Sequence, residues 1–348
     1  AKSIGVTGNE RRCIVKLASV SSGGVDRVCM ALDDKWLVDI AVALTAAMGS
    51  DTDIPPDMEA LLVQGDAGLA RLAQAKTFAE ANPDQVERLA QTDVRWYSPV
   101  RKPGKICGVA MNNSASNDRK ISAPDHPAFF LKPASCLIGH QESIRIRSYY
   151  GSVHPEPELA VIIGRRMRDV AAAHALEYVA GYSVMNDITG NAMRAEDLFQ
   201  YWAIYAQEDD PRKTNRIEQH LSYAGRYKGC DTFGVLGPWL VTRDEVPDPD
   251  DLAVYCSLAG ETIAEDSTRY YNYKVSEILS YISQFHTLSP GDVVSCGTAF
   301  KPSENRMSIH NANFQKLPGP VSVSIEGLGV QYNPVVVEER GIGEWRLG

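Results

Sequence analysis

Residues 153–164 read VHPEPELAVIIG, and this stretch passes from two glutamates into an uninterrupted apolar run. Because side chains two residues apart on a β-strand share a face, a strand here would direct His154, Glu156 and Glu158 to one side. Two neighbouring carboxylates entering a core repel each other, and a cation between them would remove that penalty. Oxygen-only ligation favours Mg²⁺, Mn²⁺ or Ca²⁺ over zinc. Two surface glutamates at a solvated strand end would fit the pattern equally well.

The prolines of this stretch and a later aspartate add two expectations. Pro155 and Pro157 remove backbone donors, so this end of the strand should lie at a sheet edge or contain a β-bulge. Residues 181–190 read GYSVMNDITG and place Asp187 at the end of a second apolar strand. A lone aspartate in that position is usually a turn residue or a cap, so the pattern alone leaves its role open.

The chain has 348 residues, more than one ordinary core needs. From Pro99 onward its pattern changes to short β-rich runs bounded by glycine, proline and asparagine. We therefore expect an N-terminal mixed α/β domain over residues 1–98 and a second domain over residues 99–348. In the first domain we expect strands at Cys13–Ala18 and Val25–Leu32 and helices at Asp39–Met48 and Met58–Ala81. In the second we expect helices at Ala171–Ala180 and Lys274–Phe285 and strands at Lys105–Val109, Ala128–Lys132, Glu158–Ile163, Gly181–Asn186, Trp239–Thr242, Asp292–Cys296 and Val321–Ile325. Spaced strands with few helices indicate an α+β class dominated by sheet, not a doubly wound parallel sheet.

Composition and charge argue against several function classes. The formal charge of −9 argues against a nucleic-acid partner, which favours a basic face. We expect no membrane association, because no apolar run is long enough to cross a bilayer, and no G-x-G-x-x-G or P-loop motif supports nucleotide binding. The seven cysteines show no Cys-x-x-Cys spacing, which favours free thiols in a reducing compartment. With no signal-peptide pattern at the N-terminus, the expected location is the cytoplasm.

Eight ordered blocks between about Pro103 and Val337 carry a family resemblance. They are KICGVAMN at 105–112, PAFFLK at 127–132, EPELAVIIG at 156–164, GYSVMND at 181–187, KGCDTF at 228–233, GPWLVT at 237–242, LSPGDVVSCGT at 288–298 and EGLG at 326–329. In this order, and across about two-thirds of the chain, the blocks resemble the fumarylacetoacetate hydrolase (FAH) superfamily. The resemblance implies a mixed β-roll, FAH-like catalytic domain, a smaller N-terminal α/β domain and a homodimer.

The resemblance also implies the roles of individual residues. Glu156, Glu158 and Asp187 would hold Mg²⁺, or Mn²⁺ or Ca²⁺ in its place. The expected catalytic residues, which would contact a substrate carboxylate or enolate, are Lys132, Lys228 and Thr298. The expected substrate-binding residues are Asn112, Arg119, Tyr182 and Gly297. Lys132 follows an apolar run, and its alternative role is that of a surface lysine whose aliphatic stem covers apolar groups while its ammonium stays in water.

One segment departs from the family pattern. Many hydrolytic members carry Gly-x-Asn-Tyr-x-x-His-x-x-Glu on a mobile lid, whereas residues 110–119 here read AMNNSASNDR. Ser116 stands at the histidine position and Arg119 at the glutamate position, and neither acts unaided as a general base. A substitute base could be one of the histidines at 126, 154 and 310, although a structural or surface role is the commoner reading for each.

We expect an enzyme that hydrolyses a carbon–carbon bond in a diketo or acylpyruvate-type acid through a metal-stabilised enolate. The alternative is a lyase, decarboxylase or isomerase, acting by 2-oxo acid decarboxylation, dienol ketonisation or dehydration of a keto-deoxy sugar acid. A non-catalytic metal-binding relative is a third hypothesis. The partner is in each catalytic case a small oxo-acid or dicarbonyl substrate. Residues 191–225 form a long insertion that would serve as a lid, a dimer arm or a solvated surface loop.

Overall fold

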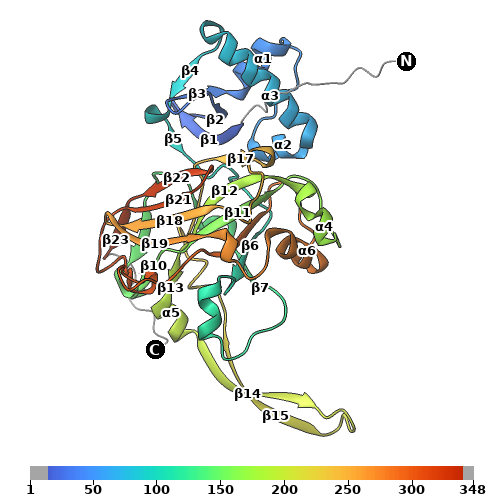
Figure 1. Cartoon of the computed structure of the whole chain (residues 1–348), viewed down its shortest axis with the longest axis vertical. Helices are drawn as coiled ribbons and strands as arrows, with labels where there is room; N and C mark the ends of the chain where they lie inside the picture. The colour runs from blue at the N-terminus through green and yellow to red at the C-terminus, as the bar shows by residue number, and fades with distance from the viewer. Residues whose placement is uncertain (1–14, 340–348) are drawn as a thin grey trace.

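The computed structural model describes residues 15–339 and is built around one large twisted sheet (Figure 1). Its main path runs β4-β3-β2-β1-β17-β12-β11-β20-β6-β7, with β5, β8 and β16 attached at its sides. The bounds are β1 Lys16–Ser22, β2 Val25–Ala31, β3 Trp36–Asp39, β4 Arg88–Ala90, β5 Arg95–Trp96, β6 Ile106–Ala110, β7 Ala128–Lys132, β8 Leu137–Ile138, β11 Pro157–Ile163, β12 Val179–Asp187, β16 Gly234–Leu236, β17 Leu240–Thr242 and β20 Val293–Thr298. All seven strands expected after residue 99 are present within two residues of their expected bounds. Of the strand expected at Cys13–Ala18, residues 13 and 14 lie outside the described residues, and β1 begins at Lys16.

The sheet crosses the expected domain boundary. Strand β1 pairs with β17, where Leu17 lies opposite Leu240, and β17 pairs in turn with β12. The same hydrophobic cluster contains Leu72 of the N-terminal helices and Ile162 of β11. The boundary at residues 98 and 99 stays a prediction, but the lobes on either side of it share a sheet and a core.

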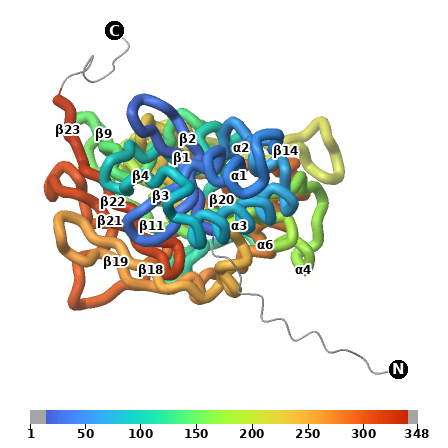
Figure 2. Tube along the Cα trace, turned by 90° about the horizontal axis from the view of Figure 1, so that it is seen from above, coloured from blue at the N-terminus to red at the C-terminus, as the bar shows by residue number. Residues whose placement is uncertain are grey.

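Three helices beside β1–β4 complete the N-terminal lobe, as the view from above in Figure 2 shows: α1 Ile40–Met48, α2 Met58–Val63 and α3 Gly65–Ala81. Asp39 and Asp57 cap α1 and α2, each accepting a hydrogen bond from a backbone N–H of the first turn. The single helix expected at residues 58–81 is interrupted at Gly65, whose φ of +60° breaks the helical path.

A second, four-stranded sheet packs against the first, and β12 contacts both β21 and β22. Its order is β19-β18-β21-β22, with bounds β18 Ala253–Leu258, β19 Glu261–Ser267, β21 Val321–Ile325 and β22 Gly329–Asn333. Strands β18 and β19 were not anticipated. The remaining pairs are β10 Val153–His154 with β13 Thr189–Gly190, and β9 Ile144–Arg147 with β23 Val335–Glu338.

Both parallel and antiparallel pairs occur, and strand content exceeds helix content, 37% against 26%, so the sheet-dominated mixed class is confirmed. Helix α6, Val275–Phe285, confirms the second expected helix. The first was too long: α4 covers Ala172–Ala175, a 3₁₀ turn follows, and Val179 already begins β12. No helix within residues 15–339 has the length and apolarity needed to cross a bilayer. The six described cysteines are free, and Cys13 lies outside the described residues.

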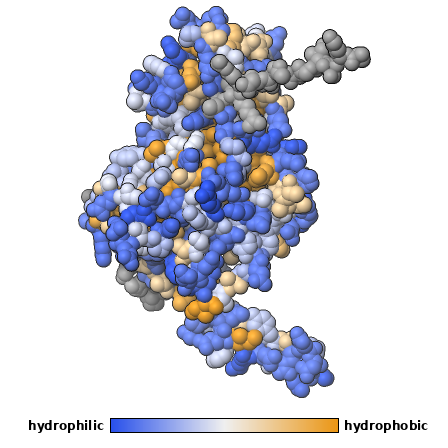
Figure 3. All heavy atoms as spheres, viewed as in Figure 1, coloured by the Kyte–Doolittle hydropathy of each residue, from blue (hydrophilic) through white to orange (hydrophobic). Residues whose placement is uncertain are grey.

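The insertion at residues 191–225 forms a short helix, α5 Asn191–Glu196, and a long hairpin that projects from the body (Figures 1 and 3). Strands β14 Leu198–Ala206 and β15 Thr214–Ser222 pair along their full nine-residue length. Several large apolar side chains of the hairpin are exposed, Trp202 to 60% and Ile204 to 64%. A two-stranded ribbon is marginally stable alone in water, so a partner surface that covers its exposed side chains would stabilise it.

A first prediction concerns the junction between the lobes. A Cβ added at Gly181 of β12 would lie 2.2 Å from the carbonyl oxygen of Val241 in β17, so backbone must move to admit it. We expect Gly181→Ala to lower the free energy of unfolding by about 1–3 kcal/mol, measured by urea denaturation. Gly225→Ala is the control, because no atom lies within 4 Å of its added Cβ. Equal stabilities of the two variants would contradict the tight β12–β17 contact.

Candidate metal centre and adjoining pocket

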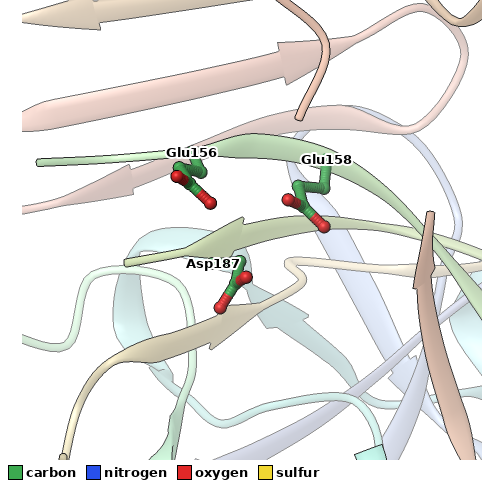
Figure 4. A group of neighbouring side chains, drawn as sticks. All are labelled: Glu156, Glu158 and Asp187. Carbon is green, nitrogen blue, oxygen red and sulfur yellow. The ribbon is translucent and has the colours of Figure 1, made fainter. Parts of the chain in front are cut away.

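The carboxylates of Glu156, Glu158 and Asp187 converge where β11 begins and β12 ends (Figure 4). Each offers an oxygen, and these oxygens lie within 4.8 Å of one another. The antiparallel register brings them together, because Glu158 lies opposite Met185, and the backbone N–H of Asp187 donates to the carbonyl of Glu156 at 2.9 Å. The convergence of the expected trio is therefore a consequence of strand pairing.

The proline-containing end of β11 is irregular in its pairing. Strand β11 lies between β12 and β20, so it is not a sheet edge, but its pairing with β20 shifts register between Glu158 and Ala160. The extra residue of this irregularity lies on β20, where the three steps from Ser295 to Thr298 face the two steps from Glu158 to Ala160. Beyond it, Ala160 and Ile162 contribute to one buried cluster, as the alternation predicted.

Glu158 is buried and is held from one side by β20 and its end. Its carboxylate accepts hydrogen bonds from Ser295 Oγ at 2.5 Å, Gly297 N at 3.1 Å and Thr298 Oγ1 at 3.2 Å. Burial, and next the neighbouring carboxylate of Asp187, raise the pKa of Glu158 to about 8. Gly297 has φ +101°, and an added Cβ would lie 2.8 Å from Cβ of Asn112, so only glycine presents its N–H here without strain.

Two lysines face the carboxylates from the other side. Lys228 Nζ donates to Glu156 Oε2 and to Asp187 Oδ2, each at 2.5 Å, and Lys132 Nζ donates to Asp187 Oδ1 at 2.7 Å. Lys132 also donates to the backbone carbonyls of Lys228 and Phe233 and is only 3% exposed, which rules out the alternative of a surface lysine.

The same contacts set the ionisation of the pair Lys228 and Glu156. Burial opposes the charged form of Lys228, but the carboxylates of Asp187, Glu156 and Glu158 outweigh it and raise its pKa. Burial likewise opposes the charged form of Glu156, but Lys228 and the hydrogen bond with His154 keep its pKa below the ordinary range. Both groups are therefore charged at neutral pH.

The charge balance of this buried cluster fits a divalent cation. Three carboxylates face two ammonium groups, so full ionisation leaves one negative charge uncompensated, and this adds to burial in opposing the ionisation of Glu158. The donor set consists of carboxylate oxygens alone, the ligands of hard divalent ions. A divalent cation is consistent with both observations, and the choice among Mg²⁺, Mn²⁺ and Ca²⁺ stays a prediction.

A cavity of about 250 Å³ adjoins the cluster. Of the expected site residues, Glu156, Lys228, Thr298 and Arg119 line it. His310, one of the candidate histidines, lines it as well, but the sequence assigned no site role to the other lining residues, among them Phe130, Thr189, Arg194, Ser222, Tyr227 and Phe300. Arg194 and Ser222 belong to the insertion, and no family block covers that segment, so only its richness in charged residues hinted at a role.

Two expected substrate-binding residues have packing roles instead. Asn112 is fully buried, donates to the carbonyl of Cys296 at 2.7 Å and accepts from the N–H of Tyr273 at 2.8 Å. Tyr182 is 2% exposed within the main hydrophobic cluster, and burial raises the pKa of its phenol. Neither lines the cavity.

The segment that lacks the family base is a short 3₁₀ helix, Ser114–Arg119. Ser116 is buried, and its hydroxyl donates to the backbone carbonyl of Asn113 at 2.7 Å, with the carbonyl of Met111 also within reach at 3.0 Å. It therefore binds its own backbone instead of facing the cavity, where it is not among the lining residues. Arg119, at the end of the same helix, reaches the cavity wall.

The three candidate histidines lie in different surroundings. His126 stacks on Tyr281 with ring centroids 4.9 Å apart and does not line the cavity. His154 is buried, with Nε2 at 3.2 Å from Glu156 Oε1, and Asn191 Nδ2 donates to its Nδ1 at 3.0 Å, so it positions a carboxylate of the cluster. His310 lines the cavity and contacts Arg119.

Comparisons with known proteins identify the family of the chain. The family model described as fumarylacetoacetate (FAA) hydrolase C-terminal matches residues 105–336. The mitochondrial oxaloacetate tautomerase FAHD2A of Bos taurus is 30% identical over 284 residues, 81% of each chain. A maleylpyruvate hydrolase from Sphingobium sp. SYK-6, solved with manganese(II) and pyruvate, is 25% identical with a TM-score of 0.64, over 93% of this chain and all of that one. A 5-carboxymethyl-2-hydroxymuconate delta-isomerase from Mycobacterium smegmatis, at the same identity and coverage, gives 0.63.

A second prediction follows from Glu158. In the metal-free protein its carboxyl pKa is about 8, whereas the unfolded chain loses that proton near the ordinary value of 4.5. A raised pKa favours the folded state at low pH, and this contribution is lost as the pH rises from about 4.5 to about 8. We expect the melting temperature in EDTA to fall over that range and Mn²⁺ to remove the fall, because a bound cation favours the ionised carboxylate.

The matched comparison for this prediction is Glu158→Gln, which lacks the titrating group. Its melting temperature in EDTA should change less with pH than that of the unaltered protein, and Mn²⁺ should stabilise it less. If the melting temperatures of the two proteins changed equally with pH, the raised pKa of Glu158 would be contradicted.

Proposed function

Because the chain belongs to the fumarylacetoacetate hydrolase family, we propose that it is a divalent-metal-dependent enzyme that interconverts keto and enol forms of a 2-oxo acid, as a tautomerase or isomerase. One observation carries the proposal: a three-carboxylate cluster and the Lys228 ammonium adjoin a cavity, and Ser116, at the family's water-activating position, is buried and does not line that cavity. Enolisation needs proton transfer at carbon but no attacking water.

The residues around the cavity suit such a substrate. Lys228 has three N–H donors, of which two go to Glu156 and Asp187, so one remains for a carboxylate or enolate oxygen. Thr298 lines the cavity and offers a hydroxyl beside it. Lys132 does not line the cavity and acts through Asp187, which it holds in place. A divalent cation on the carboxylates supplies positive charge that stabilises a developing enolate.

Hydrolysis of a carbon–carbon bond in a diketo or acylpyruvate-type acid is the second candidate. It is supported by the likeness to a maleylpyruvate hydrolase, whereas the likeness to the tautomerase and the delta-isomerase supports the first candidate. These relatives are enzymes, which removes the ground for the third hypothesis of a non-catalytic protein. Decarboxylation and dehydration have no specific observation in their favour.

The homodimer implied by the resemblance stays a prediction, and we propose the β14–β15 hairpin as its surface. By strand alternation and register, one side of the hairpin carries no charge. This uncharged face consists of Phe199, Tyr201, Ala203, Tyr205, Asn215, Ile217, Gln219 and Leu221. Gln219 accepts from Tyr201 Oη at 3.1 Å and donates to Tyr205 Oη at 2.9 Å, so these three side chains are paired within the face.

An uncharged, exposed face needs an equally uncharged partner. A second copy of the chain supplies one by two-fold symmetry, since a two-fold interface uses the same patch on both subunits. The opposite side of the hairpin mixes the charged or ionisable residues Arg216, Glu218 and His220 with the exposed Trp202 and Ile204, so it lacks the uniformly uncharged character of the first side. The proposed dimer therefore uses the uncharged face on both subunits.

A third prediction tests the reaction. With Mn²⁺ or Mg²⁺ we expect accelerated keto–enol interconversion of oxaloacetate, followed by its ultraviolet absorbance, and slower or no release of pyruvate from acylpyruvates. Lys228→Met should lower kcat by roughly 10²–10³-fold, because a charged donor near the developing enolate is lost. Lys213→Met, at the exposed tip of the hairpin, is the control. If protein with bound metal turned over neither oxaloacetate nor acylpyruvates, the proposal would be contradicted.

A fourth prediction tests the dimer. By light scattering after size exclusion, we expect a mass near twice 38.1 kDa. Ile217→Lys, which places a charge on the uncharged face, should shift the protein toward the monomer. Arg216→Lys changes the adjacent residue on the other side and should leave the dimer intact. A monomeric unaltered protein, or an Ile217→Lys dimer of equal affinity, would contradict this surface.

A further inference from the structure

The cavity contains one histidine, and its partner is unusual. Among the lining residues of the cavity, His310 is the only imidazole, and the ionisable neighbours Glu156 and Lys228 are already engaged in the carboxylate cluster. Arg119 Nη1 lies 2.9 Å from His310 Nε2. These two residues are 191 positions apart and come from two separate loops, so the fold has brought them together at the cavity wall.

The contact with Arg119 fixes the proton position on the imidazole. A guanidinium carries only donors, so Nε2 must accept, which leaves the ring neutral with its proton on Nδ1. Burial lowers the pKa of His310, and the guanidinium groups of Arg119 and Arg194 act in the same direction while Glu156 opposes them. At neutral pH the ring therefore carries a lone pair on Nε2, the atom that Arg119 orients.

The ring is also held in place by its neighbours. His310 lies in the short 3₁₀ segment Ile309–Asn311, in which the side chain of Ile309 is fully buried. Its ring meets Phe300 and His154 edge to face, with centroids 5.5 Å and 5.6 Å away. A neutral imidazole with a fixed orientation at a cavity wall has the properties required of a general base.

We propose that His310 is the proton-transfer group of this pocket and that Arg119 positions it. The inference rests on the proposed enolisation and adds the residue that performs it. It places the base on the loop after β20, and not on the 110–119 segment that carries the family's histidine. It also explains why an arginine stands at position 119, where a glutamate would remove the donor that orients Nε2.

The proton transfer balances within the substrate and one side chain. The C–H bond beside the oxo group breaks, its electron pair becomes the enolate, and the proton forms an N–H bond on His310 Nε2. A substrate carboxylate binding Arg119 would compete for Nη1 and so free that lone pair. Return of the proton to carbon or to oxygen regenerates neutral His310 and completes the interconversion.

The activity test uses pyruvate as the probe and follows exchange of its methyl protons in D₂O by NMR, with Mn²⁺ or Mg²⁺ bound. We expect exchange with the unaltered protein and a loss of roughly 10²–10⁴-fold in His310→Gln, the usual contribution of a general base. Mn²⁺ binding by His310→Gln should be unchanged. His126→Gln, which alters a histidine stacked outside the cavity, is the matched control and should exchange at the unaltered rate.

Failure of the inference and failure of the proposed function give different results. Full exchange in His310→Gln would overturn the role of His310 and leave enolisation standing. Absence of exchange in the unaltered protein with bound metal would overturn enolisation itself, and this inference with it.

A second measurement reads the positioning by Arg119 without any turnover. In metal-free protein labelled with ¹⁵N-histidine, the His310 signal, identified by its loss in His310→Gln, should report protonated Nδ1 and unprotonated Nε2. Arg119→Leu should shift this signal away from that tautomer, and Arg119→Lys, which keeps a charged donor, should retain it. A signal showing protonated Nε2 in the unaltered protein would overturn the positioning role.

Discussion

The antiparallel register of β11 and β12 is the constraint on which the site depends. It places Glu158 opposite Met185 and bonds the backbone of Asp187 to that of Glu156, so three carboxylates end on one side of a buried strand pair. Uncompensated, they would oppose folding, because a buried charge without a partner is costly. Lys132 and Lys228 offset most of that cost, and the negative charge that remains suits a divalent ion.

Part of the site could be predicted, because Glu156 and Glu158 lie two residues apart in one short stretch of sequence. Alternation along residues 153–164 placed Glu156 and Glu158 together, and the register of β11 with β20 is irregular at the end of the strand that contains Pro157. Tyr182 and Asn112 were assigned to the substrate because family blocks do not distinguish residues that contact a ligand from those that hold the strands. His310 and Arg119 illustrate the opposite difficulty, since a contact across 191 positions leaves no periodic signal in the chain.

The fold shows the same division between local and long-range information. Strand β21, with its apolar alternation, and strand β7, a short apolar run, were predicted at their observed bounds. Val179 and Ala180 were assigned to a helix, but pairing of β12 with β11 and β17 draws this end of the segment into the sheet. Strands β18 and β19 escaped prediction because their exposed positions carry mixed residues whose pairing depends on distant β21. Tertiary pairing overrides local preference in each case.

The insertion that forms the hairpin also forms part of the cavity wall, through Arg194 of α5 and Ser222 at the end of β15. One continuous piece of backbone therefore runs from the interior wall to the far end of the arm. Because the hairpin is long, a small rotation at its base displaces its tip by a larger distance. Crosslinks or labels attached near residues 207–213 would consequently report movements of a wall that they do not touch.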